Sequence, residues 1–287
     1  MAEVKELFGR TPNASIRSAA RELNISRMSV WRSLKEQKFH LYKLRLPHQL
    51  EPEDNATRLE FCRSQLEEID DDEEFISRLV FSDEANFHLQ PEVNRHNFRY
   101  WSIERPQFTM EEPLHSPHVG VWVAIGLKGI VGPYFFNTSV KATNYGQMLD
   151  DYAWPQLVGL YGEADDIPLE QVIFMQDGAP PHFGGLRWLA EHFEGRWMGR
   201  GTRRYPSPFP WPPRPPDLAV MDFFLWGYIK SRVYSSTTPY PNLESLRQAI
   251  TREMRAVPQD MIEGAMAAYG HRLQRCVEKE GGHVENY

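Results

Sequence analysis

The hydrophobic and polar positions of residues 1–45 predict three short helices. A weak amphipathic pattern over residues 3–8 should end at Gly9, because glycine readily stops a helix. The second helix has apolar residues at the spacing of one helix face, and Ser15 stands where a capping hydroxyl is preferred. These apolar residues are Ile16, Ala19, Ala20 and Leu23. Residues 1–45 are therefore expected to form an all-α domain.

A tight turn and a basic third helix follow. Asn24 tolerates the left-handed conformation of such a turn, and Ser26 can cap a helix over residues 27–37. The inward residues of this helix are Val30 and Leu34, and its outward basic residues are Arg27, Arg32, Lys35 and Lys38. Helix, turn and basic helix are typical of a helix-turn-helix, which lays its second helix in the major groove of DNA. A solvated helical hairpin is the alternative, but small Ala20 at the helix crossing and Ile25 under the turn favour DNA binding.

The pattern changes twice along the rest of the chain. Residues 46–76 predict a linker and a connecting helix over residues 55–69, whereas short apolar runs from Ser77 onward predict strands. The expected strands are 78–81, 86–89, 119–127, 130–137 and 171–175. The expected helices are 144–158, 186–193, 217–233, 243–256 and 259–277, with a loop over 195–216. Strands followed by mixed strands and helices predict an α/β body over residues 77–287.

Composition narrows the class of protein. With 287 residues, 41% of them hydrophobic and 25% charged, the chain is typical of globular proteins with a core. No apolar run approaches the roughly 20 residues of a membrane helix, and the first residues lack the apolar centre of a signal peptide. Two cysteines, Cys62 and Cys276, are too few for a disulfide scaffold or a zinc ribbon and are expected to be inert. Membrane-spanning and secreted classes are therefore not expected.

The net charge of −7 hides a division along the chain. Residues 1–50 hold ten Lys/Arg and four Asp/Glu, whereas residues 51–74 hold eleven acids and two arginines. A basic head on an acidic body predicts that DNA or RNA, if bound, is met first by the N-terminal helices.

Two apolar runs predicted as strands end in aspartate, LVFSD at Asp83 and VIFMQD at Asp177. Ligands of α/β proteins bind at the ends of strands, and gathered carboxylates repel unless a cation such as Mg²⁺ or Mn²⁺ lies between them. Asp217 or Asp222 is a candidate third acid. Each acid also has a structural interpretation, as a strand-end cap, a turn former or a helix cap. Spacing alone leaves both interpretations open.

Several motifs together carry a resemblance to a known family. They occur in the order FSDEANFHL, VNRHN, QDGAPPH, WPPRPPDLAVMDFFLWGYIK and GGHVEN, and the resemblance as a whole runs from about Ile16 to Tyr287. In these motifs the chain closely resembles the transposases of the mariner/Tc superfamily. The resemblance implies a helix-turn-helix region, here over residues 1–45, and a ribonuclease H-like catalytic domain with a DDE or DDD triad, here over residues 77–287.

The resemblance assigns the triad to Asp83, Asp177 and Asp222, which leaves Asp217 as a helix cap. Glu84 should point to the opposite face of the strand from Asp83. The implied chemistry uses two Mg²⁺ or Mn²⁺ ions, bridged by Asp83, for hydrolytic strand cleavage at transposon ends and then for strand transfer into a TA target.

Other residues have more than one interpretation. His182 lies near the second acid, where it would contact the scissile phosphate or serve as a structural histidine. Four arginines of the loop are candidates for DNA phosphate contacts or for a solvated surface: Arg196, Arg200, Arg203 and Arg204. Four aromatic residues are expected in the core: Trp122, Phe223, Phe224 and Trp226.

The chain departs from the family in two ways. Only one helix-turn-helix precedes Asp83, and it resembles the second unit of the family. The segment between Asp177 and Asp222 is also longer than in the best-known mariner elements. We expect a DNA transposase acting in the nucleus on inverted-repeat double-stranded DNA as a homodimer, in a truncated or decayed form. The alternative is a co-opted or relic DNA-binding protein with a non-catalytic scaffold.

Overall fold

The computed structural model describes residues 2–11, 14–39, 50–89, 117–162, 167–235 and 239–284. The chain divides into two compact units, residues 1–48 and residues 49–287. Each unit has its own hydrophobic core. The VNRHN motif at residues 93–97 lies outside the described residues.

The first unit contains the helices α1 (Ala2–Arg10), α2 (Ile16–Glu22) and α3 (Arg27–Glu36). The Oγ atoms of Ser15 and Ser26 each accept a hydrogen bond of 3.0 Å from the backbone N–H three residues later. Asn24 has a φ of 52° in the turn between α2 and α3. Both predicted caps and the predicted turn are therefore confirmed.

The core of the first unit is small and lies between its three helices. Its buried residues are Val4, Leu7, Phe8, Ala19, Ala20 and Val30. α1 continues through Gly9 to Arg10, so the expected helix end is wrong. The expected burial of Ile25 is wrong as well: this residue is 39% exposed and is not part of the core, to which α2 and α3 contribute Ala19, Ala20 and Val30.

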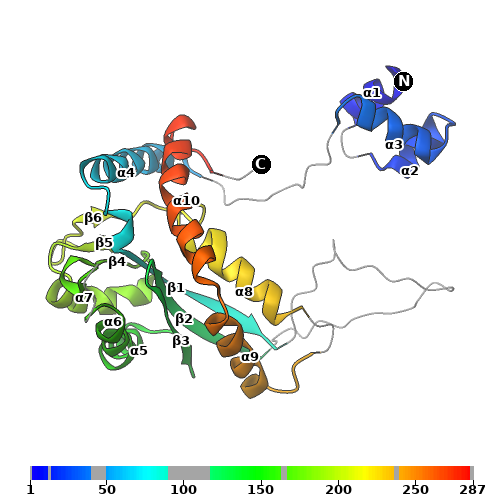
Figure 1. Ribbon diagram of the computed structural model, residues 1–287. Coiled ribbons are helices and arrows are strands. Elements are labelled where there is room, and N and C mark those ends of the chain that lie inside the picture. Colours follow the sequence, from blue (N-terminus) through cyan, green and yellow to red (C-terminus); the bar gives the residue numbers. More distant parts are fainter. Residues whose placement is uncertain are drawn as a thin grey trace. The chain divides into compact units, whose positions relative to one another are not determined.

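Within the described part of the second unit, six strands form one mixed sheet in the order β3-β2-β1-β4-β5-β6 (Figure 1). The strands are β1 (Leu79–His88), β2 (His118–Gly126), β3 (Gly129–Phe136), β4 (Ile173–Met175), β5 (Trp197–Gly199) and β6 (Phe209–Pro210). β1, β2 and β3 pair antiparallel, whereas β4, β5 and β6 extend the sheet from β1 in parallel. The predicted hairpin of β2 and β3 is confirmed.

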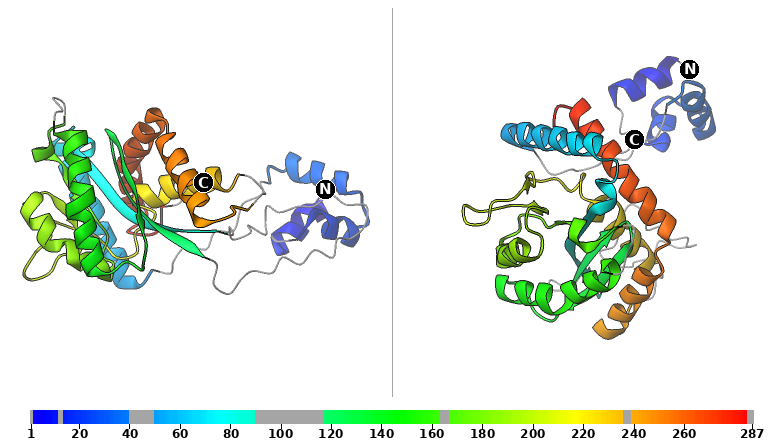
Figure 2. Two further views of the ribbon diagram at one scale, coloured as in Figure 1. Left: turned by 90° about the horizontal axis from the view of Figure 1, so that it is seen from below. Right: turned by 60° about the vertical axis from the view of Figure 1, so that its left-hand side comes forward.

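Helices cover both faces of this sheet (Figure 2). One layer contains α5 (Ala142–Met148), the π-helical turn η2 (Leu149–Ala153), α6 (Trp154–Tyr161) and α7 (Leu186–His192). The other contains α4 (Pro52–Asp71), α8 (Trp226–Val233), α9 (Leu243–Arg255) and α10 (Gln259–Glu278). Along β1, Phe81 joins the core beneath α8 to α10, and its neighbour Val80 joins the core beneath α5 to α7. Because side chains alternate between the two faces of a strand, β1 contributes residues to both cores. The predicted α/β class is confirmed.

Three features differ from the sequence pattern. β1 is one continuous strand where two short ones were expected. The expected loop over residues 195–216 contains β5 and β6, because Trp197 and Met198 are buried and pair with β4 and β6. The helix expected to connect the units, α4, belongs to the second unit and packs against α10. None of the helices in the described segments is both long and apolar enough to cross a membrane.

Candidate active site

The register of the sheet places two of the predicted acids at the same level. The parallel pairing of β1 with β4 ends at Phe81 and Met175. Asp83 and Asp177 each lie two residues beyond this last pair, so they are at equivalent positions where the pairing of β1 with β4 ends. Asp83 is not at a strand end, as the sequence suggested, because β1 continues there as the antiparallel partner of β2, with Asp83 opposite Val123. The edge is instead created by the end of β4.

The third acid reaches this edge from the helical layer. Asp222 lies in η5 (Met221–Leu225), a π-helical turn that leads directly into α8. Trp226, one helical turn after Asp222, donates its Nε1–H to Oδ2 of Asp83 at 2.7 Å. Trp226 is 6% exposed, so it is a core residue as predicted, but its contact with Asp83 was missed. The spacing of four residues was the signal that could have found it.

Electrostatic interactions connect the three acids. Burial, together with repulsion from Asp222 and Glu84, raises the pKa of Asp83 to about 8. Desolvation of the Asp222 carboxyl by nearby protein atoms, together with repulsion from Asp177, raises its pKa to about 6, although the residue as a whole is exposed. Asp222 therefore lies within electrostatic reach of both other acids. A site in which like charges raise pKa values is typical of functional carboxylates.

Asp177 has a different partner, His182. Burial would raise the pKa of Asp177, but the hydrogen bond from His182 outweighs it and the pKa is lowered. The Nδ1 atom of His182 lies 2.6 Å from Asp177 Oδ1, and its Nε2 lies 2.9 Å from Glu84 Oε2. Although burial disfavours a charged imidazole, these two carboxylates raise the pKa of His182 to about 10. A protonated His182 therefore bridges Asp177 and Glu84.

The bridge also settles the orientation of Glu84. Its contact is with His182, whereas Asp83 contacts Trp226 on the other side of the strand, so the predicted opposite orientation is confirmed. His182 is 3% exposed and stacks on Tyr145, with ring centres 4.4 Å apart. Both ring nitrogens of His182 are occupied, and a phosphate contact would require one of them to be released.

The chemistry of these side chains fits a hard divalent cation. Their ligating atoms are all carboxylate oxygens. Burial is the largest cause of the raised pKa values of Asp83 and Asp222, and repulsion from neighbouring acids, which a cation would relieve, adds to it. Glu84 adds to the repulsion on Asp83, and its Oε1 is buried with no hydrogen-bond partner in the described residues. In this conformation, no three metal-ligating side chains among the described residues are gathered around one point. Two of the acids have protein partners: the indole N–H of Trp226 is hydrogen-bonded to Asp83, and the imidazole of His182 is paired with Asp177.

Replacing Asp83 by asparagine should stabilise the metal-free protein, and more so as the pH rises. The pKa of this carboxyl is 3.8 in its ordinary state and about 8 here, so the folded chain binds the proton more tightly and loses stability between about pH 4 and pH 8. The amide of the variant would keep an oxygen for Trp226 without the charge. We expect the melting temperature of Asp83→Asn to exceed that of the wild type by about 3 °C or more at pH 8, with little difference near pH 4. Thermal unfolding in EDTA across this range measures it, and a pH-independent difference would contradict it.

Comparisons with known proteins find transposases of similar sequence and fold. Transposable element Tc3 transposase of Caenorhabditis elegans is 25% identical over 248 residues, which are 85% of this chain and 67% of that protein. The Mos1 transposase paired-end complex with left transposon end aligns with 99% of this chain and 79% of its own, at a TM-score of 0.72 and 20% identity. The Mos1 mariner paired end complex with Mn aligns with 99% and 80%, at a TM-score of 0.73 and 20% identity. No family model matches the chain.

By these comparisons the chain is similar to transposases of the mariner/Tc type. The resemblance seen in its motifs is confirmed, and so is the ribonuclease H-like class of its mixed sheet and helical layers.

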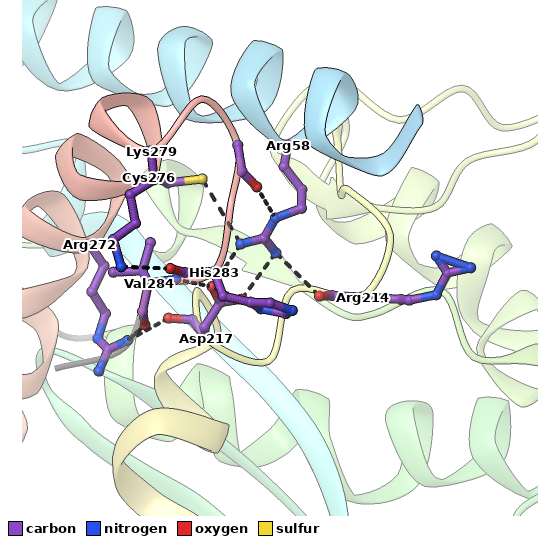
Figure 3. Close-up of polar contacts among 9 residues, drawn as sticks. Arg58, Arg214, Asp217, Arg272, Cys276, Lys279, His283 and Val284 are labelled. Carbon is purple, nitrogen blue, oxygen red and sulfur yellow. Dashed lines mark hydrogen bonds and ion pairs between the residues drawn. The ribbon is translucent and has the colours of Figure 1, made fainter. Parts of the chain in front are cut away.

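Asp217 is the centre of a buried ion network and not a helix cap (Figure 3). Arg58 of α4 donates hydrogen bonds of 3.0 and 2.7 Å to the two carboxylate oxygens, and its Nε donates to the carbonyl of Gly281 at 2.8 Å. The side chains of Arg58 and Asp217 are 0% and 3% exposed. The helical segment begins only at Met221, so the predicted cap is wrong. A buried guanidinium offers the carboxylate a stronger, bidentate partner than backbone N–H groups.

The end of the chain joins the same network (Figure 3). Val284 donates its N–H to Asp217 at 2.7 Å, and Arg272 of α10 donates to the backbone carbonyls of both residues. Gly281 has a φ of 85°, and a Cβ there would lie 1.9 Å from the carbonyl oxygen of Asn55. Residues 281–284 of the GGHVEN motif therefore close α10 onto α4, and only glycine fits at this crossing.

The arginines before Asp222 separate into two groups. Arg196 donates to three backbone carbonyl oxygens, so this candidate DNA contact is a structural residue. The exposed ones are Arg200, Arg203 and Arg204. Arg200 stands over the Phe183 ring at 6.0 Å and packs its carbons close to Gly178, next to the second acid. These exposed arginines remain candidates for contact with a DNA backbone near the acids.

The remaining expectations concern the core. Trp122 is fully buried as predicted, whereas Phe223 and Phe224 are half-buried at the edge of the larger core.

A hydrogen bond with Cys276 and burial raise the pKa of the Cys62 thiol far above its usual range, so this thiol stays protonated. The basic residues in and just after α3 that were predicted to contact DNA are all exposed: Arg27, Arg32 and Lys35 in α3, and Lys38 two residues after its end.

Proposed function

We propose that this chain cuts DNA strands by metal-dependent hydrolysis and joins the cut end to a target DNA. The observation that carries the proposal is the placement of three aspartates at one edge of the sheet: Asp83 and Asp177 lie two residues beyond the last pair of β1 and β4, and Asp222 lies in η5, one turn before the tryptophan that binds Asp83. It is supported by the fold that the chain shares with Mos1, one of whose paired-end complexes is described as containing Mn.

Asp83, Asp177 and Asp222 would hold Mg²⁺ or Mn²⁺, with two ions in the site. When bound, such ions activate a water or a 3′-hydroxyl and stabilise the leaving oxygen of a phosphodiester. Trp226 orients Asp83 by holding Oδ2, which leaves Oδ1 for a cation. His182 positions Asp177 beside the end of β4, and Asp222 lies on the solvent side, where a DNA strand would arrive.

DNA would be held by basic residues of both units. The exposed basic residues of α3 suit the major groove and its phosphates, and Arg200, which lies near Gly178, suits the backbone close to the cut. The proposal includes the expectations taken from the family: inverted-repeat DNA, a TA target, a homodimer and action in the nucleus.

Removing the metal should abolish strand cleavage reversibly. We expect the purified chain to nick supercoiled plasmid DNA in Mn²⁺ or Mg²⁺, to stop nicking in excess EDTA and to resume when the metal is restored. Gel electrophoresis of the relaxed plasmid measures the rate, and DNA binding in EDTA serves as the control. Binding without nicking at saturating metal would contradict the proposal and favour a DNA-binding protein on a non-catalytic scaffold.

A further inference from the structure

The helix-turn-helix unit exposes an unusual set of apolar side chains. Met28 is 55% exposed, Trp31 47% and Ile25 39%. Met28 and Trp31, with Ile16 and Arg27, line a shallow hollow of about 290 Å³. In a unit with such a small core, leaving a tryptophan and a methionine in solvent is costly unless a partner covers them.

The helical repeat directs these residues away from the core. On α3, Val30 and Ser33 are buried against the other helices. Met28, Trp31 and Lys35 follow each other at spacings of three and four residues, so they form one outward stripe. The Nζ atom of Lys35 lies 5.0 Å from the centre of the Trp31 ring, which attaches a positive charge to the apolar surface.

The surrounding charge decides what kind of partner fits. Residues 1–50 carry ten Lys/Arg against four Asp/Glu, and the apolar stripe is bordered by exposed Arg27 and Arg32. A second copy of this unit would bring the same positive charges together, whereas duplex DNA brings phosphates to the rim. The first turns of such a helix meet base edges in the major groove, where the 5-methyl group of thymine is the apolar feature of the bases.

We propose that Met28 and Trp31 recognise the 5-methyl groups of thymine in the DNA that this unit binds. The inference rests on the proposed function only in taking DNA as the ligand of the first unit. Arg32 and Lys35 then provide affinity for phosphates that is independent of sequence, and the two apolar side chains provide preference for thymine at one or two positions.

The test removes the methyl group and nothing else. The full-length chain is used to select a preferred site from a pool of randomised DNA duplexes in EDTA. The selected duplex is then made with thymine, with uracil, and with 5-bromouracil, whose bromine has about the size of the methyl group. Because burying one methyl group is worth about a fourfold change in affinity, uracil should weaken binding about fourfold at one contacted position and by more than tenfold at two. Bromouracil should restore binding.

Variants assign the effect to residues. Trp31→Ala and Met28→Ala should bind thymine and uracil duplexes with nearly equal affinity, and this ratio does not depend on how much of the variant is folded. Arg32→Ala should weaken binding to both duplexes alike and reduce its salt dependence. Val158→Ala removes a side chain of similar exposure, 40%, from the second unit and should leave the ratio unchanged.

Equal affinity of the wild type for thymine and uracil duplexes would overturn the inference while leaving metal-dependent nicking intact. Binding with no sequence preference would overturn it too. Self-association in sedimentation that is lost in Trp31→Ala, with DNA binding unchanged, would replace it with a contact between copies. Failure of the proposed function would appear separately, as the absence of nicking at saturating metal.

Discussion

DNA nicking should fall by about a thousandfold or more when Asp222 is replaced by alanine, and equally for Asp83→Ala and Asp177→Ala. Each change removes a carboxylate that would hold a cation, and cation stabilisation of a phosphodiester transition state is worth several kcal/mol. The measurement is the nicking rate at saturating Mn²⁺. Asp222→Ala is the most informative of the three substitutions, because the exposed Asp222 side chain can be truncated with little effect on folding.

A matched control is Asp150→Ala, which removes an exposed aspartate from the opposite helical layer and should keep the wild-type rate. Circular dichroism and thermal unfolding confirm that each variant is folded. An undiminished rate in any one of the three variants would take that residue out of the site. DNA binding by the first unit should persist in all of them.

Breaking the buried ion pair should be the most destabilising single change. Arg58→Met leaves the Asp217 carboxylate buried without its bidentate partner, and uncompensated buried charges of this kind cost about 3–5 kcal/mol of unfolding free energy. For a unit of this size the melting temperature should fall by about 6–20 °C. Urea unfolding followed by circular dichroism measures the free energy directly.

The same helix offers the control. Arg63→Met removes an exposed arginine from α4 and should change stability by less than about 0.5 kcal/mol. In the double variant Arg58→Met/Asp217→Asn the buried charge is gone, so its loss should be smaller than the sum of the two single losses. Additive losses would mean that the ion pair contributes no coupling and that each residue acts through packing alone.

These two predictions separate acids that look alike in the motif PDLAVMD. Asp217 and Asp222 are five residues apart, and each has a plausible role as the third acid when spacing is the guide. In the structure, Asp217 accepts hydrogen bonds from Arg58 and Val284, and these bonds hold α10 against α4. Asp222 alone remains within reach of the other two acids. Substituting Asp217 should therefore unfold the second unit, whereas substituting Asp222 should spare its fold.

The sequence determined those features that are written in a few neighbouring residues. The serine caps, the left-handed Asn24 and the β2–β3 hairpin follow from local hydrogen bonding and backbone preference, which need no distant partner. The opposite orientation of Asp83 and Glu84 follows from the alternation of any strand. The ordered motifs also carried the resemblance to mariner/Tc transposases, which the comparisons confirm.

Only the tertiary structure decided what depends on residues far apart in the chain. Asp83 lies at a sheet edge because β4 ends two residues before Asp177, and a strand pairing of this kind leaves no mark in the pattern of β1 itself. The His182 bridge to Glu84 and the Arg58 pair with Asp217 join residues separated by 98 and 159 positions. A charged side chain takes the partner that the fold brings nearest, and local spacing carries no information about that partner.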